Sequence, residues 1–174
     1  SDFWPKKMNG RIINSFLFTI NSFFGLIFKT NSKDLLIYTT EPPFLICISW
    51  IIRILKKSPY IVILFDIYPE LLTKLSIVRE NTLVIRFWEY FNKFALTYST
   101  EIVVLNEEMK SRIISKYNLN PNKVAVIPTW VDEKKLKFIP KKNNWFLDKY
   151  NLTNKFVIMY SGNQGRGHDF LTVL

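Results

Sequence analysis

The sequence contains a single cysteine, Cys47, so an intrachain disulfide is excluded. This cysteine lies inside an apolar run, which favours a thiol that fills space in a core and fits a reducing, cytosolic compartment. Signatures of helix-turn-helix, zinc-binding and RNA-binding proteins are also missing, so nothing here supports nucleic acid as a partner. No small-residue cleavage site follows the first apolar stretch, which argues against a signal peptide.

Acidic residues are scarce relative to basic ones. The 174 residues include 14 Asp and Glu against 24 Lys and Arg, for a net charge of +10. This excess indicates an anionic partner such as phospholipid headgroups, nucleic acid or a phosphorylated substrate, and charge alone does not choose among them. A solvated helix face and a lysine-rich linker would give the same bias. A hydrophobic content of 48% predicts a globular chain.

Apolar runs and helical periodicities alternate along the chain. Strands are predicted at residues 33–38, 59–65, 101–105, 124–127 and 156–160, and helices at residues 12–27, 45–55, 82–98 and 106–117. Asn106 is the expected N-cap of the last of these helices. Alternation of this kind predicts an α/β fold with a Rossmann-like parallel sheet and flanking helices.

The helix at residues 12–27 is amphipathic and follows Lys6, Lys7 and Arg11. Its apolar run is interrupted by polar residues, so a buried or interfacial helix is favoured over a transmembrane one. Basic residues beside an apolar face suit an anionic membrane surface. A helix that faces the core is the simpler interpretation, and we take it as the primary expectation.

Two carboxylates follow the most apolar predicted strand. Asp66 comes directly after residues 59–65, and Glu70 stands four residues later. In open α/β sheets ligands bind beyond the carboxyl ends of the strands. Asp66 and Glu70 are therefore candidate site residues, although a turn or N-cap role for Asp66 is equally compatible with the sequence.

A glycine loop follows the predicted strand at residues 156–160. Gly162, Gly165 and Gly167 allow backbone N–H groups to approach a ligand, and Arg166 offers a charged fork to a phosphate. The spacing G-x-x-G-x-G matches neither the dinucleotide fingerprint nor the Walker loop, so a glycine-rich βα turn without a ligand remains an alternative. His168 is a second candidate for a phosphate contact.

Several patches together resemble one family. Residues 39–44 (TTEPPF), 66–70 (DIYPE), 103–110 (VVLNEEMK), 127–132 (IPTWVD) and 160–166 (YSGNQGR) are similar, in this order, to bacterial family 4 glycosyltransferases of surface-polysaccharide assembly, which have the GT-B fold. The resemblance implies a chain truncated at both ends. Residues 1–135 would form part of the N-terminal, acceptor-side domain, residues 136–154 an interdomain linker, and residues 155–174 the start of the donor domain.

The resemblance also implies an activity. Members of the family transfer a sugar, with retention of configuration, from a nucleotide-diphosphate sugar to an acceptor, here expected to be a lipid-linked glycan. Neither a metal nor a cofactor is expected, so basic side chains and backbone N–H groups must meet the leaving-group charge. Gly162, Asn163, Gly165 and Arg166 match the loop that contacts the donor diphosphate. The expected location is cytoplasmic, peripheral at the inner face of the plasma membrane.

This sequence departs from the family at positions near the proposed cleft. Phe65 stands where many relatives have a histidine, and Asn106 replaces a common serine, so no general base is assigned. A non-catalytic, membrane-associated scaffold that kept the GT-B fold is the alternative. Because residues 155–174 supply only the start of a donor site, the chain by itself is predicted to be inactive.

Overall fold

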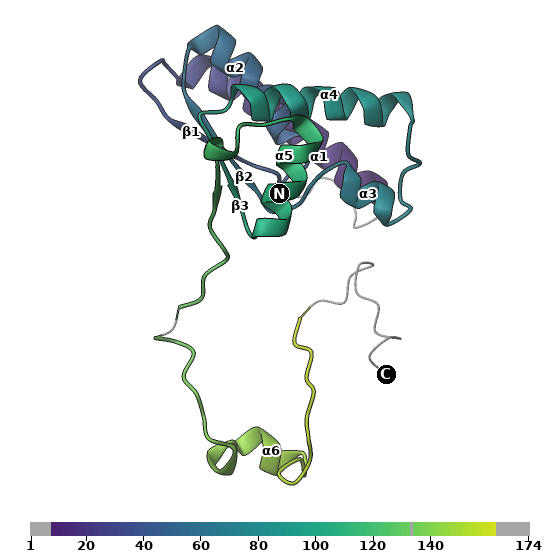
Figure 1. The fold of residues 1–174 in the computed structure, drawn as a ribbon, viewed down its shortest axis with the longest axis vertical. Coiled ribbons are helices and arrows are strands. Elements are labelled where there is room, and N and C mark those ends of the chain that lie inside the picture. The colour runs from purple at the N-terminus through teal and green to yellow at the C-terminus, as the bar shows by residue number, and fades with distance from the viewer. Residues whose placement is uncertain (1–7, 133, 163–174) are drawn as a thin grey trace. The chain divides into compact units, whose positions relative to one another are not determined.

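The computed structural model describes residues 8–132 and 134–162, and the chain divides into two units after Pro128. The first unit is an α/β fold whose four strands form one parallel sheet in the order β1-β2-β3-β4 (Figure 1). The strands are β1 (Leu36–Thr39), β2 (Tyr60–Leu64), β3 (Glu101–Val104) and β4 (Val124–Val126). This arrangement confirms the predicted Rossmann-like class and four of the five predicted strands.

The helices of the first unit include the four predicted ones, together with short elements that were not predicted. They are α1 (Met8–Lys29), the 3-10 turn η1 (Leu45–Ile48), α2 (Ser49–Lys56), α3 (Glu70–Lys74), α4 (Leu83–Tyr98), α5 (Glu107–Tyr117) and the 3-10 turn η2 (Pro121–Lys123). The predicted single helix at residues 45–55 begins as a 3-10 turn. The short helix α3 was not predicted, because its five residues are too few to show a helical period.

The core lies on one face of the sheet. Alternate residues of the strands, among them Tyr60, Val62 and Leu64 of β2, are almost fully buried, whereas those between them are half-buried or exposed. Residues of η1, α4 and α5 complete the core. Successive strand side chains point to opposite faces, so the described residues cover one face of this sheet and leave the other open.

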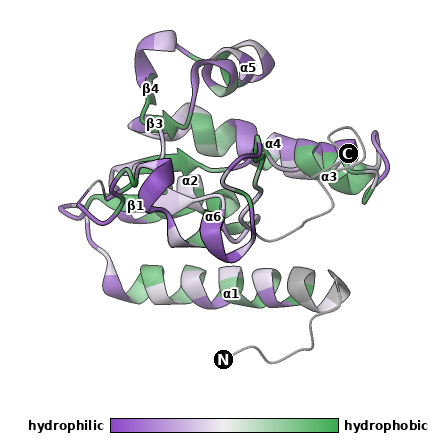
Figure 2. Ribbon diagram, turned by 90° about the horizontal axis from the view of Figure 1, so that it is seen from below, coloured by the Kyte–Doolittle hydropathy of each residue, from purple (hydrophilic) through white to green (hydrophobic). Residues whose placement is uncertain are grey.

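The helix α1 packs on η1 and α2 but keeps much of its apolar surface exposed. Phe16 is 56% exposed, Phe24 54% and Phe28 82%. Figure 2 shows α1 alongside the rest of the unit, with hydrophobic and hydrophilic residues interleaved along it. The expectation of a core-facing helix is therefore wrong for most of these side chains. None of the helices in the described residues is both long and apolar enough to cross a bilayer.

The described part of the second unit contains two short helical segments. These are η3 (Lys141–Asn143) and α6 (Trp145–Lys149). The strand predicted at residues 156–160 is not present: these residues pair with no strand of the described part of the chain, and Phe156 is 93% exposed. An apolar run forms a strand only where a neighbouring strand receives its hydrogen bonds. The predicted boundaries of the acceptor domain, linker and donor domain stay predictions.

Candidate functional site

The segment after β2 places Asp66 and Glu70 at the carboxyl edge of the parallel sheet. Together with residues of α3 and α5 they line a pocket of about 230 Å³. The lining residues are Phe65, Asp66, Ile67, Glu70, Leu71, Lys74, Asn106, Glu108, Met109 and Arg112. Typical ligand pockets measure about 300–1,000 Å³, so this pocket is the size of a subsite. The two predicted carboxylates thus share one polar pocket.

Two buried side chains fix the backbone that carries Asp66. The hydroxyl oxygen of Thr40, which is 1% exposed, accepts hydrogen bonds from the N–H groups of Phe65 at 3.0 Å and Asp66 at 3.3 Å. Further along, the Nδ2 atom of Asn92 donates to the carbonyl oxygen of Tyr68 at 2.7 Å. Thr40 and Asn92 thus hold the backbone on both sides of Asp66, and neither of these two residues lines the pocket.

Glu70 is the centre of an ion-pair network. Its carboxylate binds the guanidinium of Arg112 and lies 3.2 Å from Nζ of Lys74 and 3.5 Å from Nζ of Lys116. Lys116 in turn lies 2.7 Å from a carboxylate oxygen of Glu89 on α4. The network ties α3 to α4 and α5 across one wall of the pocket.

These contacts decide the protonation state of Glu70. Partial burial raises the pKa of its carboxyl, but the hydrogen bonds from Arg112 and Lys74 and the charge of Lys116 outweigh that effect and hold the pKa below its ordinary value. Glu70 is therefore ionised at neutral pH and already bound by cations. It is suited to holding the pocket together and poorly suited to accepting a proton.

Asp66 is the other carboxylate of the pocket. Within the described part of the chain, its side chain takes part in no hydrogen bond or ion pair, whereas its backbone N–H is held by Thr40. A carboxylate placed in this way can accept hydrogen bonds from the hydroxyl groups of a ligand. It is the better of the two candidates for direct contact with a substrate.

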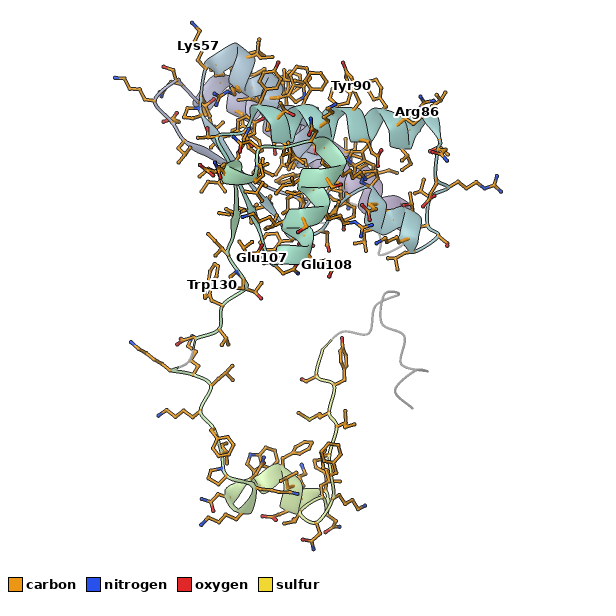
Figure 3. All side chains as sticks on the ribbon, in the orientation of Figure 1. Lys57, Arg86, Tyr90, Glu107, Glu108 and Trp130 are labelled. Carbon is orange, nitrogen blue, oxygen red and sulfur yellow. The ribbon has the colours of Figure 1, made fainter. Side chains whose placement is uncertain are left out.

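Asn106 has the capping role predicted for it. Its Oδ1 atom accepts the N–H of Met109 at 2.8 Å, and Glu107 and Glu108 occupy the first turn of α5 (Figure 3). This cap aims the start of α5 at the pocket. Asn106, which stands where the glycosyltransferases named above commonly have a serine, is thus a helix cap, and serine also performs this role well.

The sequence did not identify the cations of the site. Arg112 and Lys116 are four residues apart on α5 and so share a helix face, but the sequence does not show that this face meets Glu70. In residues 8–132 and 134–162 we find no group of three or more His, Cys, Asp or Glu residues arranged to hold a metal ion.

The predicted diphosphate loop is described only at its first residue. Gly162 is exposed at a bend in the second unit. Asn163, Gly165 and Arg166, together with the alternative His168, lie outside the described residues. Their roles therefore stay predictions.

The chain matches no protein-family model. It is 22% identical over 156 residues to a probable glycosyltransferase, WbjE, of Pseudomonas aeruginosa. The match covers 90% of this chain and 38% of that protein's length. The chain thus spans well under half of the relative that it matches.

Proposed function

We propose that this chain is the acceptor-side part of a glycosyltransferase of the GT-B type. The complete protein transfers a sugar, with retention, from a nucleotide-diphosphate sugar to a lipid-linked glycan in surface-polysaccharide assembly. It works as a peripheral protein at the cytoplasmic face of an anionic membrane. The observation that carries this proposal is the polar pocket of Asp66 and Glu70 at the carboxyl edge of the parallel sheet.

The chemistry of the pocket suits a carbohydrate. Carboxylates accept hydrogen bonds from sugar hydroxyls, and the Lys74 and Arg112 side chains donate to hydroxyl oxygens. Similarity to a probable glycosyltransferase over most of the chain supports the same class. In this proposal Asp66 contacts the acceptor, while Glu70, through its ion pairs, holds α3 and α5 at the spacing that the acceptor needs.

The donor is held by the loop that carries Gly162, Asn163, Gly165 and Arg166. Backbone N–H groups and the guanidinium of Arg166 meet the charge of the leaving diphosphate, without a metal or cofactor. In the complete enzyme, Arg166→Ala is expected to weaken nucleotide-sugar use by ~1.5–3 kcal/mol, the range typical of a hydrogen bond to a charged group. If this variant has wild-type kinetics, the assignment of Arg166 to the donor site is wrong.

The test uses the full-length protein that contains this sequence, mixed with a panel of nucleotide-diphosphate sugars and membrane lipid extract. Release of nucleoside diphosphate and labelling of the lipid fraction report transfer. Asp66→Asn removes the charge and is expected to lower kcat/KM for the acceptor by roughly 10- to 100-fold, the range typical of losing a hydrogen bond to a charged group. Glu101→Gln, at the opposite edge of the sheet, serves as the control and should match the wild type.

If the full-length protein binds no nucleotide sugar and releases no diphosphate, the enzyme assignment is wrong. The non-catalytic scaffold would then be the better interpretation. If transfer proceeds normally with Asp66→Asn, the reaction class stands but the role of Asp66 does not.

A further inference from the structure

The polar pocket at the carboxyl end of β2 also contains apolar surface. Phe65, the residue directly after β2, lines the pocket and is 40% exposed. Its backbone N–H donates to the hydroxyl oxygen of Thr40 at 3.0 Å, so the backbone that carries the aromatic ring is fixed. The half-buried residues Ile67, Leu71 and Met109 add to this apolar surface. A ligand in the pocket therefore meets a large aromatic ring as well as carboxylates.

The cations of the lining are already paired within the protein. They are Lys74 and Arg112, and both bind the carboxylate of Glu70. The hydrogen bond to Glu70 and the charges of Glu70 and Glu108 raise the pKa of Arg112, because both carboxylates favour its protonated form. Asp66 is a third carboxylate of the lining. Among the described residues that line the pocket, neither cation is thus left to balance the charge of an anionic ligand.

The carboxylate of Asp66 decides which ligands the pocket tolerates. In the described part of the chain its side chain has no hydrogen bond or ion pair, so a phosphate or carboxylate group placed beside it would be repelled. An uncharged ligand with hydroxyl groups would instead donate hydrogen bonds to Asp66. Lys74 and Arg112 have several N–H groups each, so they can donate to hydroxyl oxygens while they remain bound to Glu70.

The size and the mixed surface of the pocket match a single sugar ring. Its volume of about 230 Å³ is below the 300–1,000 Å³ of pockets that hold drug-sized ligands. A pyranose carries hydroxyl groups around its rim and C–H groups on its faces. These C–H groups are attracted to the face of an aromatic ring, which is the negative part of the ring's quadrupole. Phe65 can therefore contact a face of the sugar while Asp66 accepts its hydroxyl groups.

We propose that this pocket binds one uncharged pyranose ring of the acceptor, with a C–H face of the sugar against Phe65 and its hydroxyl groups on Asp66. The inference rests on the proposed function and deepens it, because it names the class of acceptor. An uncharged sugar is accepted at this position, whereas a uronic acid or a phosphorylated sugar is rejected. Phe65 is then a residue that determines acceptor specificity.

The experiment is nuclear magnetic resonance of the 174-residue chain with four methyl glycosides. The glucoside, galactoside and mannoside are uncharged, and the glucuronide carries a carboxylate on the ring that it shares with the glucoside. Saturation transfer should reach the C–H protons of at least one uncharged sugar, and amide shifts should change within residues 65–74 and 106–112. The glucuronide should bind at least about tenfold more weakly, because like charges repel. Equal binding of the glucuronide, no binding of any uncharged sugar, or shifts confined to other residues would overturn the proposal.

Three variants test the aromatic contact. Phe65→Ala should lower the affinity for the uncharged sugar by about tenfold, whereas Phe65→Trp keeps an aromatic face and should bind within about threefold of wild type. Phe28→Ala removes a ring that is 82% exposed on α1 and does not line the pocket, so it should bind as wild type does. Unchanged affinity in Phe65→Ala would show that the sugar does not contact this ring. The comparison of the glycosides uses the wild type and so does not depend on how well a variant folds.

Activity of the full-length protein tests the enzyme assignment separately. With an acceptor that ends in an uncharged sugar, Phe65→Ala should raise the acceptor KM by about tenfold, while Phe28→Ala should leave it unchanged. If no nucleotide sugar yields diphosphate, the enzyme assignment is wrong, while glycoside binding still decides what the pocket holds. If transfer proceeds equally well to an acceptor that ends in a uronic acid, the enzyme assignment stands and the selectivity proposed for the pocket is wrong.

Discussion

The Thr40 hydroxyl fixes the position of the backbone at the candidate carboxylate Asp66. Its oxygen is the acceptor for two consecutive N–H groups, at Phe65 and Asp66, and no solvent reaches it. Thr40→Val keeps the shape of the side chain but leaves both N–H groups without this acceptor. We expect the free energy of unfolding to fall by ~1–3 kcal/mol, the cost of an unsatisfied buried polar group.

Urea denaturation of the 174-residue chain measures this loss. Thr40→Ser retains the hydroxyl and loses only a methyl group, so it should recover most of the stability that Thr40→Val loses. If the valine variant unfolds at the wild-type urea concentration, the hydroxyl does not hold the loop.

Glu70 gives the chain a pH dependence of predictable sign. Because cations hold its folded-state pKa below the ordinary value of 4.5, the ionised carboxylate stabilises the fold. That contribution is complete above pH 4.5 and is lost as the pH falls from there through the lowered pKa. Glu70→Gln should therefore be less stable than wild type at pH 7, and the difference should shrink below about pH 4.5.

Urea midpoints of wild type and variant at pH 7, 5 and 3.5 provide the measurement. Glu80→Gln, at an exposed position before α4, controls for the loss of one negative charge. A gap between wild type and Glu70→Gln that stays constant over this pH range would show that the ion pairs contribute no net stability.

How much of the site could be predicted differs from residue to residue. The sequence predicts that Asp66 and Glu70 follow the carboxyl end of β2, where they do lie, because the end of an apolar strand is visible in it; their part in binding a ligand stays a prediction. The partners of Glu70 were not predicted, since Arg112 and Lys116 reach it only through the packing of α5 beside α3. Nor does a sequence show which threonine hydroxyl turns inward, as that of Thr40 does.

Among the elements, the helices with capping residues were the most predictable. Asn106 accepts a hydrogen bond from the N–H of Met109 at 2.8 Å, and α5 begins directly after it, as expected. Elements shorter than two helical turns, such as η1 and α3, carry no such signal. The strand expected at residues 156–160 was wrong because a strand depends on its neighbours as well as on its own residues.

The start of α5 offers a test at this scale. Asn106→Ala removes the side-chain acceptor of the Met109 N–H, and we expect it to lower the free energy of unfolding by ~1 kcal/mol, as for other N-caps. Asn106→Asp keeps an acceptor and adds a charge that the helix dipole favours, so it should be at least as stable as wild type. Thermal or urea unfolding of wild type and the two variants measures these differences in stability. If Asn106→Ala is as stable as wild type, water satisfies the Met109 N–H as well as the Asn106 side chain does.

At the scale of the whole molecule, the parallel sheet is incompletely covered. Such sheets usually have both faces buried, yet here Ile37 of β1 is 61% exposed on the face away from the core. In the second unit, Ile158 is 74% exposed and Met159 67%. Exposed apolar surface of this kind marks a place of contact with another surface.

The last prediction concerns the 174-residue chain by itself, which we expect not to catalyse sugar transfer. A donor site of the proposed type needs a sheet behind the glycine loop and groups that grip the sugar and ribose. In the described part of the second unit, residues 156–160 have no strand beside them, so the sheet that such a site needs is not formed there. Titration calorimetry with several nucleotide-diphosphate sugars should show no micromolar binding, and no diphosphate should be released. The full-length protein is the positive control. Micromolar binding with turnover by the short chain would mean that the donor half is dispensable and that the active cleft lies elsewhere.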